Sequence, residues 1–355
     1  MNKIGYCIWA PDFVKSSAGI RALYILCDQL NSMGYDSHVV FSSKTPANLS
    51  APLMSLKKAS SLAKSGKKIV VYPETVPGNP LDAKYVVRWV LNIPGLLGGT
   101  RIYNPNEKVF YYSEVFKPYI CNKTEGKLYL PTVEEDIFHN NDVKASERNL
   151  TVFYVGKSTF KPGYFEKNKA LEITRTFPEK SSLGPIFRQA SVFYCFDNSS
   201  IICYEAAMCG CPTIIIPDGT QTREDYEKLE LGMNGIAWGP EELPSAVESI
   251  KNLKPKYDQI KANFGNEIEY FVKSTQEWDD EKIDSYIASL PTDLLETRNQ
   301  KIKEFQELYF STSFTLAKNL QGKYPNIIEI SFLFAFALKK ISFMKKIMYK
   351  FIGRK

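Results

Sequence analysis

Two acidic residues eight positions apart give the clearest chemical signal in this sequence. Asp197 and Glu205 lie in the stretch CFDNSSIICYEAAMCGCP (195–212), and the apolar run TIIIP follows it. The pattern predicts a strand, a turn, a short helix that carries the second acid, a Gly/Pro break and another buried strand. Ionised carboxylates accept hydrogen bonds from vicinal hydroxyl groups. With no basic partner evident, the pair indicates a hydroxyl-rich ligand at the carboxyl ends of the strands.

The same stretch resembles the E-x7-E signature of retaining GT-B glycosyltransferases, especially those of glycosyltransferase family 4. The matching positions are Glu205-Ala206, Gly210 and Pro212, whereas Asp197 stands where the family usually has glutamate. The resemblance implies that Glu205 binds the nucleotide ribose and that Asp197 contacts the donor sugar. It also implies a donor site that includes Asn198, Ser199 and Ser200. The alternative is that Asp197 only caps the helix and that Glu205 is a surface acid.

Two further motifs follow the family's order over residues 151–250. The stretch GKSTFKPG (156–163) follows an apolar strand pattern and resembles the G-R…K-G element that opens the donor domain. By that resemblance Gly156, Lys157 and Lys161 belong to the donor site, and the two lysines neutralise the leaving diphosphate, although a lysine lacks the bidentate fork of arginine. Two solvated lysines on a loop are the alternative. GMNGIAWGPEEL (232–243) resembles the element that closes the family's donor domain.

The N-terminal half predicts a β-α-β unit. Strand patterns at 4–10 and 37–42 flank a helical repeat that ends before Gly34, and the loop 16–19 precedes the helix. This loop resembles the Gly-rich first loop of GT-B enzymes, which makes Gly19 a candidate donor-binding residue because a helix N-terminus offers free N–H groups to phosphate. An ordinary tight turn is the alternative. Further strands are predicted at 68–73, 108–112 and 127–130, with a helix over 86–91; such alternation is typical of a parallel sheet covered by helices.

Two other acids are candidates for catalysis. Asp12 and Glu74 each follow a predicted strand, where an inverting enzyme could use one of them as the general base for the acceptor hydroxyl. Acids at strand exits also cap helices. The two histidines, His38 and His139, do not lie on an obvious loop for the histidine that retaining members often have near the donor sugar.

Length and composition predict two domains and no metal cofactor. The 355 residues are divided into an N-terminal acceptor domain (1–145), a donor-nucleotide domain (146–290) and a helical extension (291–355). The seven cysteines show no C-x-x-C pattern and no fourth zinc ligand. Lys157, Lys161 and the helix ends are expected to replace a metal, and the nucleotide-diphosphate sugar is the only small molecule required. The first residues do not resemble a signal peptide, which predicts a cytoplasmic protein.

The C-terminal segment is basic and amphipathic. Residues 326–355 carry seven Lys or Arg and one acid, which equals the whole chain's excess of six positive charges. Basic amphipathic helices lie in the interface of anionic membranes, and this apolar run is too short to span one. A helix packed on the body or on a partner is the alternative. The residues expected at the membrane are Phe332, Phe336, Lys339, Lys340, Phe343, Lys345, Lys346 and Lys350.

Together these features predict an α/β protein of the GT-B type, with two Rossmann-like domains facing each other across a cleft and a C-terminal amphipathic helical tail. The expected activity is transfer of a sugar from a nucleotide sugar to a lipid-linked glycan at the inner face of the cell membrane, in O-antigen-like or capsule-like polysaccharide synthesis. The resemblance favours retention of configuration. Two alternatives stay open: an inactive GT-B scaffold and a nucleotide-sugar epimerase. Other polysaccharide-assembly enzymes are candidate partners, and nucleic acid is not expected to be one.

Overall fold

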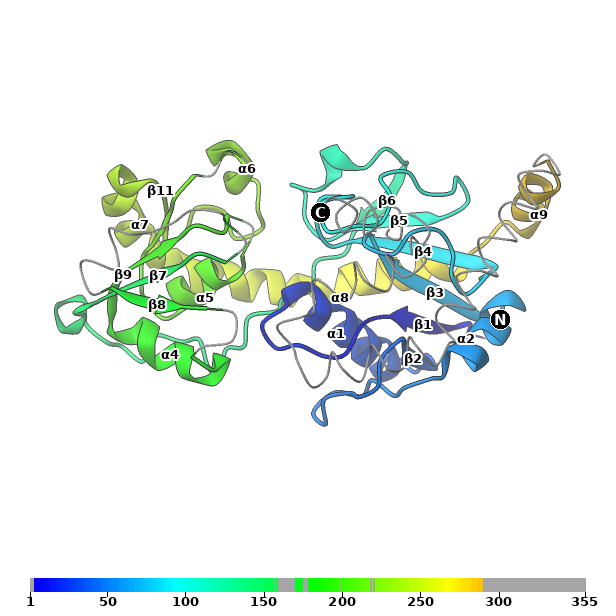
Figure 1. The fold of residues 1–355 in the computed structure, drawn as a ribbon, viewed down its shortest axis with the longest axis horizontal. Coiled ribbons are helices and arrows are strands. Elements are labelled where there is room, and N and C mark those ends of the chain that lie inside the picture. Colours follow the sequence, from blue (N-terminus) through cyan, green and yellow to red (C-terminus); the bar gives the residue numbers. More distant parts are fainter. Residues whose placement is uncertain are drawn as a thin grey trace, which may run out of the picture.

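The computed structural model describes residues 3–156, 158, 170–174, 178–198, 200–217, 219 and 221–289. Over these residues the chain forms two α/β domains, each built on its own parallel sheet (Figure 1). The predicted fold class is therefore confirmed. The predicted tail, 291–355, lies outside the described residues.

The first domain contains a six-stranded parallel sheet in the order β2-β1-β3-β4-β5-β6. Residues alternate along β1: Tyr6 and Ile8 face a core shared with α1, whereas Cys7 and Trp9 face a core shared with α2. A sheet covered on both faces needs strands that are apolar on both sides, as these are. The elements are β1 Gly5–Trp9, α1 Ala18–Ser32, β2 Ser37–Val40, α2 Leu56–Lys64, β3 Lys68–Pro73, β4 Tyr85–Val90, β5 Lys108–Tyr111, η1 Lys117–Tyr119 and β6 Thr124–Lys127.

The second domain contains a five-stranded parallel sheet in the order β11-β10-β9-β7-β8. Its core gathers the inner faces of α4 and α5 against β7 and β9. Its elements are η2 Ala145–Glu147, β7 Leu150–Tyr154, β8 Leu171–Ile173, α4 Lys180–Gln189, β9 Ala190–Cys195, α5 Ile202–Met208, β10 Thr213–Ile215, α6 Arg223–Glu227, β11 Ile236–Trp238, η3 Pro240–Glu242, α7 Leu243–Ser249 and η4 Ile250–Asn252.

One long helix belongs to both domains. In α8 (Leu253–Gln276), Tyr257 lies in the core of the second domain, whereas Phe271 lies in the core of the first. Figure 1 shows α8 running from one sheet to the other. The chain then continues into α9 (Asp280–Ser289), whose Ile283 also packs in the first domain. The last part of the predicted second domain, 146–290, thus packs in the core of the first domain, and the division of the chain into these domains stays a prediction.

Two predicted elements differ from the structure. The strand predicted at 127–130 lies three residues earlier, as β6, and residues 128–130 follow it without regular structure. Residues 86–91 were expected to be helical, but Tyr85–Val90 form β4, which is buried along its whole length. A central strand buried on both faces reads as a continuous apolar run, and such a run resembles a buried helix. Strands β1, β2, β3, β5, β7 and β10 lie where the sequence predicted them.

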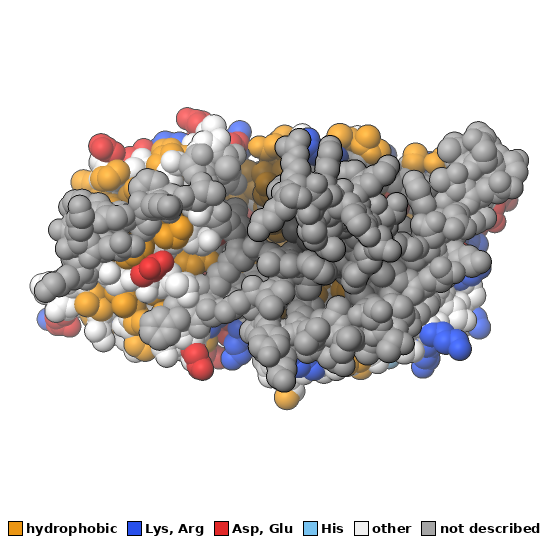
Figure 2. Space-filling view, viewed as in Figure 1, with side chains coloured by type: hydrophobic (Ala, Val, Ile, Leu, Met, Phe, Trp, Pro, Cys, Tyr) orange, Lys and Arg blue, Asp and Glu red, His pale blue; other side chains and the backbone are white. Residues whose placement is uncertain are grey.

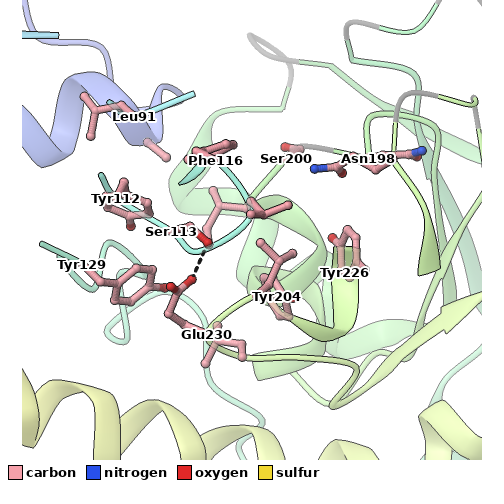
Figure 3. A pocket seen from close by; sticks show the side chains of 17 residues that line it. Leu91, Tyr112, Ser113, Phe116, Tyr129, Asn198, Ser200, Tyr204, Tyr226 and Glu230 are labelled. Atoms are coloured by element: carbon pink, nitrogen blue, oxygen red, sulfur yellow. Dashed lines mark hydrogen bonds between the residues drawn. The ribbon is translucent and has the colours of Figure 1, made fainter. Parts of the chain in front are cut away.

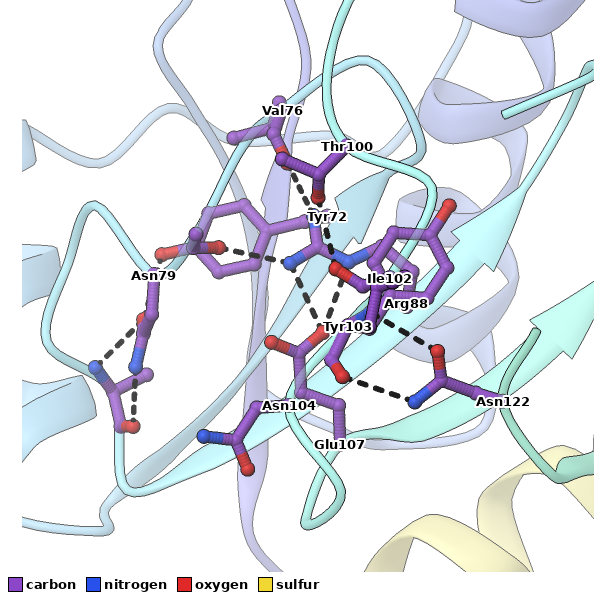
Figure 4. Close-up of polar contacts among 12 residues, drawn as sticks. Tyr72, Val76, Asn79, Arg88, Thr100, Ile102, Tyr103, Asn104, Glu107 and Asn122 are labelled. Carbon is purple, nitrogen blue, oxygen red and sulfur yellow. Dashed lines mark hydrogen bonds and ion pairs between the residues drawn. The ribbon is translucent and has the colours of Figure 1, made fainter. Parts of the chain in front are cut away.

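A buried arginine on β4 holds the segment that follows β3. Arg88 is fully buried; its Nε donates to Glu107 Oε2 at 3.0 Å. The two Nη atoms donate to the carbonyl oxygens of Val76 and Gly78 at 2.6 and 2.8 Å (Figure 4). The ring of Tyr103 lies 4.9 Å from the guanidinium carbon. The guanidinium is thus compensated by a carboxylate and by carbonyl groups, which is the condition for burying a charge.

Exposed lysines gather on the first domain. Figure 2 shows Lys and Arg side chains at the end of the molecule where α2 and the N-terminus lie. The exposed lysines of α2 and the turn after it are Lys57, Lys58, Lys64 and Lys67. No helix among the described residues is long and apolar enough to cross a membrane.

Replacing Arg88 by Met is expected to destabilise the first domain by about 3–5 kcal/mol, because Glu107 would remain buried without its partner. Urea unfolding followed by tryptophan fluorescence measures this, since Trp9 and Trp89 are both buried in that domain. Lys64→Met, which removes an exposed ion pair to Asp82, is the control and is expected to change stability by less than about 1 kcal/mol. Equal effects of the two substitutions would contradict the role of Arg88 as the partner that compensates buried Glu107.

Candidate functional site

The strand orders locate a site at the carboxyl ends of both sheets. In the first sheet β1 lies between β2 and β3, so the chain changes direction between β1 and β3. In the second sheet β7 lies between β8 and β9, so the change falls between β7 and β9. Open α/β sheets bind ligands in the crevice at such a switch point. Asp12 and Glu74 follow β1 and β3, and Gly156 and Asp197 follow β7 and β9.

A pocket lies between the two domains. Its volume is about 120 Å³. Figure 3 shows its side chains converging from both domains. The first domain contributes Ala18, Gly19, Leu91, Tyr112, Ser113, Val115, Phe116 and Tyr129, and the second contributes Asn198, Ser200, Ile201, Tyr204, Gln221, Tyr226, Leu229, Glu230 and Leu231. A mostly apolar cavity with a few polar groups is typical of small-molecule sites.

The N-terminus of α1 opens onto this pocket. Ser17 caps the helix by accepting a hydrogen bond from the backbone N–H of Ile20, and Ala18 and Gly19 belong to the pocket wall. A Cβ atom added at Gly19 would come no closer than 3.8 Å to Leu91. Gly19 is thus not required by packing, and its missing side chain leaves room for a ligand at the helix end.

Asp197 lies on the loop between β9 and α5. It is 5% exposed, and a Cβ at Gly156 would approach its Oδ2 to 2.5 Å. Since Gly156 also has a φ of +60°, only glycine fits this turn. The helix begins at Ile202, so Asp197 lies five residues before α5 and is not its capping residue. Asn198 and Ser200 of the same loop line the pocket.

Glu205 is engaged by two cations, which the sequence did not predict. Its Oε1 lies 2.8 Å from Lys180 Nζ, at the start of α4, and 3.3 Å from Arg21 Nη2, on α1. Both Glu205 and Arg21 are 3% exposed. The expectation of an acid without a basic partner is therefore wrong for Glu205. Arg21 belongs to the first domain, so this ion pair joins the domains.

The cationic groups around Glu205 have further partners. Lys180 Nζ lies 3.0 Å from Glu134 Oε1, in the segment that connects the two sheets. Arg21 donates to the backbone carbonyl of Lys15, which precedes α1. The network thus ties the connecting segment, α4, α5 and the entry to α1 together. Glu205 is not among the residues that line the pocket.

Asp12 and Glu74 hold the loops at the edge of the first sheet. Asp12 Oδ1 accepts from Ser42 Oγ and from the N–H of Ser43, at 2.9 and 2.6 Å. Glu74 is 3% exposed, and its Oε2 accepts from the N–H of Leu91 at 2.9 Å. Both carboxylates therefore connect neighbouring loops at the switch point, and neither belongs to the pocket lining. Their catalytic role stays a prediction.

Glu230 is a pocket residue that the sequence did not reveal. It follows α6, its side chain is 6% exposed, and its Oε2 accepts from Ser113 Oγ of the first domain at 2.8 Å (Figure 3). Burial raises the pKa of this carboxyl above its usual range. No local motif marks Glu230, because its surroundings come from distant parts of the chain.

Several predicted residues lie outside the described part of the chain. They are Lys157, Lys161 and Ser199 of the donor site, and the membrane residues Phe332, Phe336, Lys339, Lys340, Phe343, Lys345, Lys346 and Lys350. Among the described residues no group of three or more His, Cys, Asp or Glu is arranged to hold a metal ion. The prediction that no metal is required stays a prediction.

The comparisons with known proteins found similarity to solved structures. No protein-family model and no curated protein match the sequence. A T4 phage BGT mutant in complex with UDP-glucose aligns with a TM-score of 0.44 and 11% identity, covering 76% of this chain and 99% of that one. Sucrose-phosphate synthase from Thermosynechococcus elongatus aligns with a TM-score of 0.39 and 12% identity, covering 82% of this chain and 100% of that one. AviGT4, a glycosyltransferase involved in avilamycin A biosynthesis, aligns with a TM-score of 0.35 and 11% identity, covering 84% of this chain and 97% of that one. Such scores identify neither a family nor a substrate for this chain.

Replacing Arg21 by Met is expected to destabilise the protein by about 1.5–3 kcal/mol, because a buried charge-assisted hydrogen bond to Glu205 is lost. The effect should be smaller when Glu205→Gln is already present, with a coupling of about 0.5–3 kcal/mol in a double-mutant cycle measured by urea unfolding. Lys117→Met, which removes an exposed pair with Glu114, is the control. Additive effects of Arg21→Met and Glu205→Gln would contradict the ion pair.

Proposed function

We propose that this protein is a glycosyltransferase that binds a nucleotide-diphosphate sugar between its two domains and transfers the sugar to an acceptor hydroxyl. One observation carries the proposal. Gly19 in the first half and Asn198 and Ser200 in the second were predicted from separate motifs, and all three line one inter-domain pocket. Ligands of open α/β sheets bind at this edge.

The proposed chemistry relies on positioning and on charge stabilisation. The first residues of α1, Ala18 and Gly19, belong to the pocket wall, and the N-terminus of a helix favours a diphosphate. Lys157 and Lys161 follow β7 in sequence and would add positive charge to the leaving group. Binding sites for drug-sized ligands usually have volumes of about 300–1,000 Å³, so this cavity accommodates part of a nucleotide sugar. Metal-independent transfer with retention of configuration, as the resemblance implies, completes the proposal.

The proposed acceptor is a lipid-linked glycan at the cytoplasmic face of a membrane. The support is the sequence of residues 326–355, whose basic and aromatic residues suit an anionic lipid surface. An enzyme held at that surface meets an acceptor that is itself anchored there. A membrane-bound enzyme with a membrane-anchored acceptor suits surface polysaccharide synthesis, which we propose as the process.

Gly19→Ala tests the donor site without disturbing the fold. The added methyl group meets only ordinary contacts, and alanine favours a helix over glycine, so the melting temperature without ligand should stay equal or rise. Wild-type protein is expected to show a base-selective thermal shift with one of UDP, GDP, CMP or TDP, and Gly19→Ala should reduce that shift, because the methyl group blocks close approach to the α1 N–H groups.

The matched control is Gly265→Ala in α8, where an added Cβ has nothing within 4 Å and which is not a pocket-lining residue. It should be stabilised similarly and should keep the nucleotide shift. If no nucleotide shifts the wild-type protein, the enzyme proposal fails and the scaffold alternative gains support.

Lys345→Gln/Lys346→Gln in the full-length protein tests the membrane proposal. Each lysine near an anionic surface contributes about 1 kcal/mol, so the double variant should bind vesicles containing phosphatidylserine roughly 30-fold more weakly. Co-sedimentation measures this binding. Lys57→Gln/Lys58→Gln on α2 removes the same charge from the exposed patch of the first domain and should leave the affinity nearly unchanged. Equal losses of vesicle affinity for both variants would contradict a membrane-binding role of the C-terminal segment.

A further inference from the structure

Glu230 has a role that no sequence motif assigns. We propose that Glu230 binds a sugar hydroxyl in the inter-domain pocket, with its Oε1 atom as the hydrogen-bond acceptor. This inference rests on the proposed glycosyltransferase function and names the residue that recognises the sugar portion of the ligand.

The two oxygens of Glu230 differ in their surroundings. Ser113 Oγ donates to Oε2 at 2.8 Å. Oε1 is buried and has no hydrogen-bond partner among the residues that the structure describes. Its cationic neighbour, Lys127 Nζ, lies 3.7 Å away, beyond hydrogen-bond distance. A buried acceptor without a donor is unfavourable, and a ligand hydroxyl would supply the missing donor.

Charge at this position is only partly compensated. Lys127 Nζ also lies 3.6 Å from Glu267 Oε1, so one ammonium group serves two carboxylates. The pKa of Glu230 is raised chiefly by burial, against the opposing effects of Ser113, the backbone N–H groups of residues 230 and 114, and Lys127. The other titratable side chains that interact with it electrostatically are Tyr111, Tyr112, Tyr129 and Tyr204. The excess negative charge disfavours a phosphate here and leaves a neutral hydroxyl as the compatible ligand group.

Aromatic rings beside Glu230 complete a sugar site. Tyr112 and Tyr129 of the first domain have ring centroids 4.7 Å apart, and Tyr204 and Tyr226 of the second are stacked at 6.0 Å. Figure 3 shows Glu230 between Tyr129 and Tyr204 at the wall of the pocket. Tyrosine rings offer apolar faces to the C–H groups of a sugar, while a carboxylate orients its hydroxyls.

The competing explanation is that Glu230 only connects the domains through Ser113. Glu230→Gln distinguishes the domain contact from sugar binding, because glutamine keeps an acceptor oxygen for Ser113 but cannot ionise. Glu267→Gln is the matched control: it removes a carboxylate from the same lysine but lies outside the pocket lining.

The first arm of the test needs no ligand. A carboxyl whose pKa is raised by folding stabilises the protein below its unfolded pKa, and that stability is lost as the pH rises through the folded pKa. Glu230→Gln resembles the protonated form. Its melting temperature should therefore exceed that of wild type at about pH 8, and the difference should disappear as the pH falls below about 4. A lower melting temperature at both values would show that Glu230 serves the domain contact and would overturn the proposal.

The second arm uses UDP, GDP, CMP and TDP and their common sugar conjugates as probes. Glu230→Gln should bind the preferred free nucleotide as wild type does, but should bind its sugar conjugate and turn it over at least about tenfold less well. Wild-type turnover should increase with pH over a range above the usual pKa values of carboxyl groups. Glu230→Gln should lack this increase. Glu267→Gln should retain turnover.

The outcomes distinguish this inference from the function on which it rests. Nucleotide binding by wild type with unchanged sugar-conjugate affinity and turnover in Glu230→Gln would overturn the role of Glu230 alone. A wild-type protein that binds none of the probes would contradict the proposed function, and the role of Glu230 with it.

Discussion

The arrangement of this protein depends on one helix that both hydrophobic cores share. The 24 residues of α8 bury Leu253 and Tyr257 in the second domain and Ile268, Phe271 and Val272 in the first. Its end is tied to β1, because the side chain of Gln276 hydrogen-bonds with both the N–H and the carbonyl group of Ile4. Separating the domains would require bending α8 or exposing these apolar side chains. The helix therefore brings the carboxyl edges of two independent parallel sheets together.

Buried charges gather where those edges meet. Glu205 is compensated by Arg21 and Lys180, and that network joins α1 to the second domain. Glu230 is compensated less completely, by Ser113 and by a lysine it shares with Glu267. Fully compensated groups rigidify an interface, whereas an incompletely satisfied group in a cavity marks a position where a ligand completes the structure. The first network joins the domains, and the ribose-binding role of Glu205 stays a prediction; the second network points to binding.

The sequence predicted the fold class and most strands of the two sheets because apolar runs separated by Gly and Pro follow directly from local physics. It misassigned β4, since Val86, Val87 and Trp89 face two cores at once and show no alternation. The pocket positions of Gly19, Asn198 and Ser200 agree with their motifs. The partners of Glu205 and the surroundings of Glu230 could not be predicted, because Arg21 is 184 residues from Glu205 and Ser113 is 117 residues from Glu230. Such contacts are decided by how the domains pack.

A ligand bound between the two domains contacts both of them at once, and hydrogen exchange measures such a contact. The wild-type protein would be compared with and without the nucleoside diphosphate that raises its melting temperature. We expect protection in the same experiment at the start of α1, residues 17–21, and at the β9–α5 loop and α5, residues 196–208. Protection confined to one domain, with the other exchanging as in the free protein, would contradict a site between the domains.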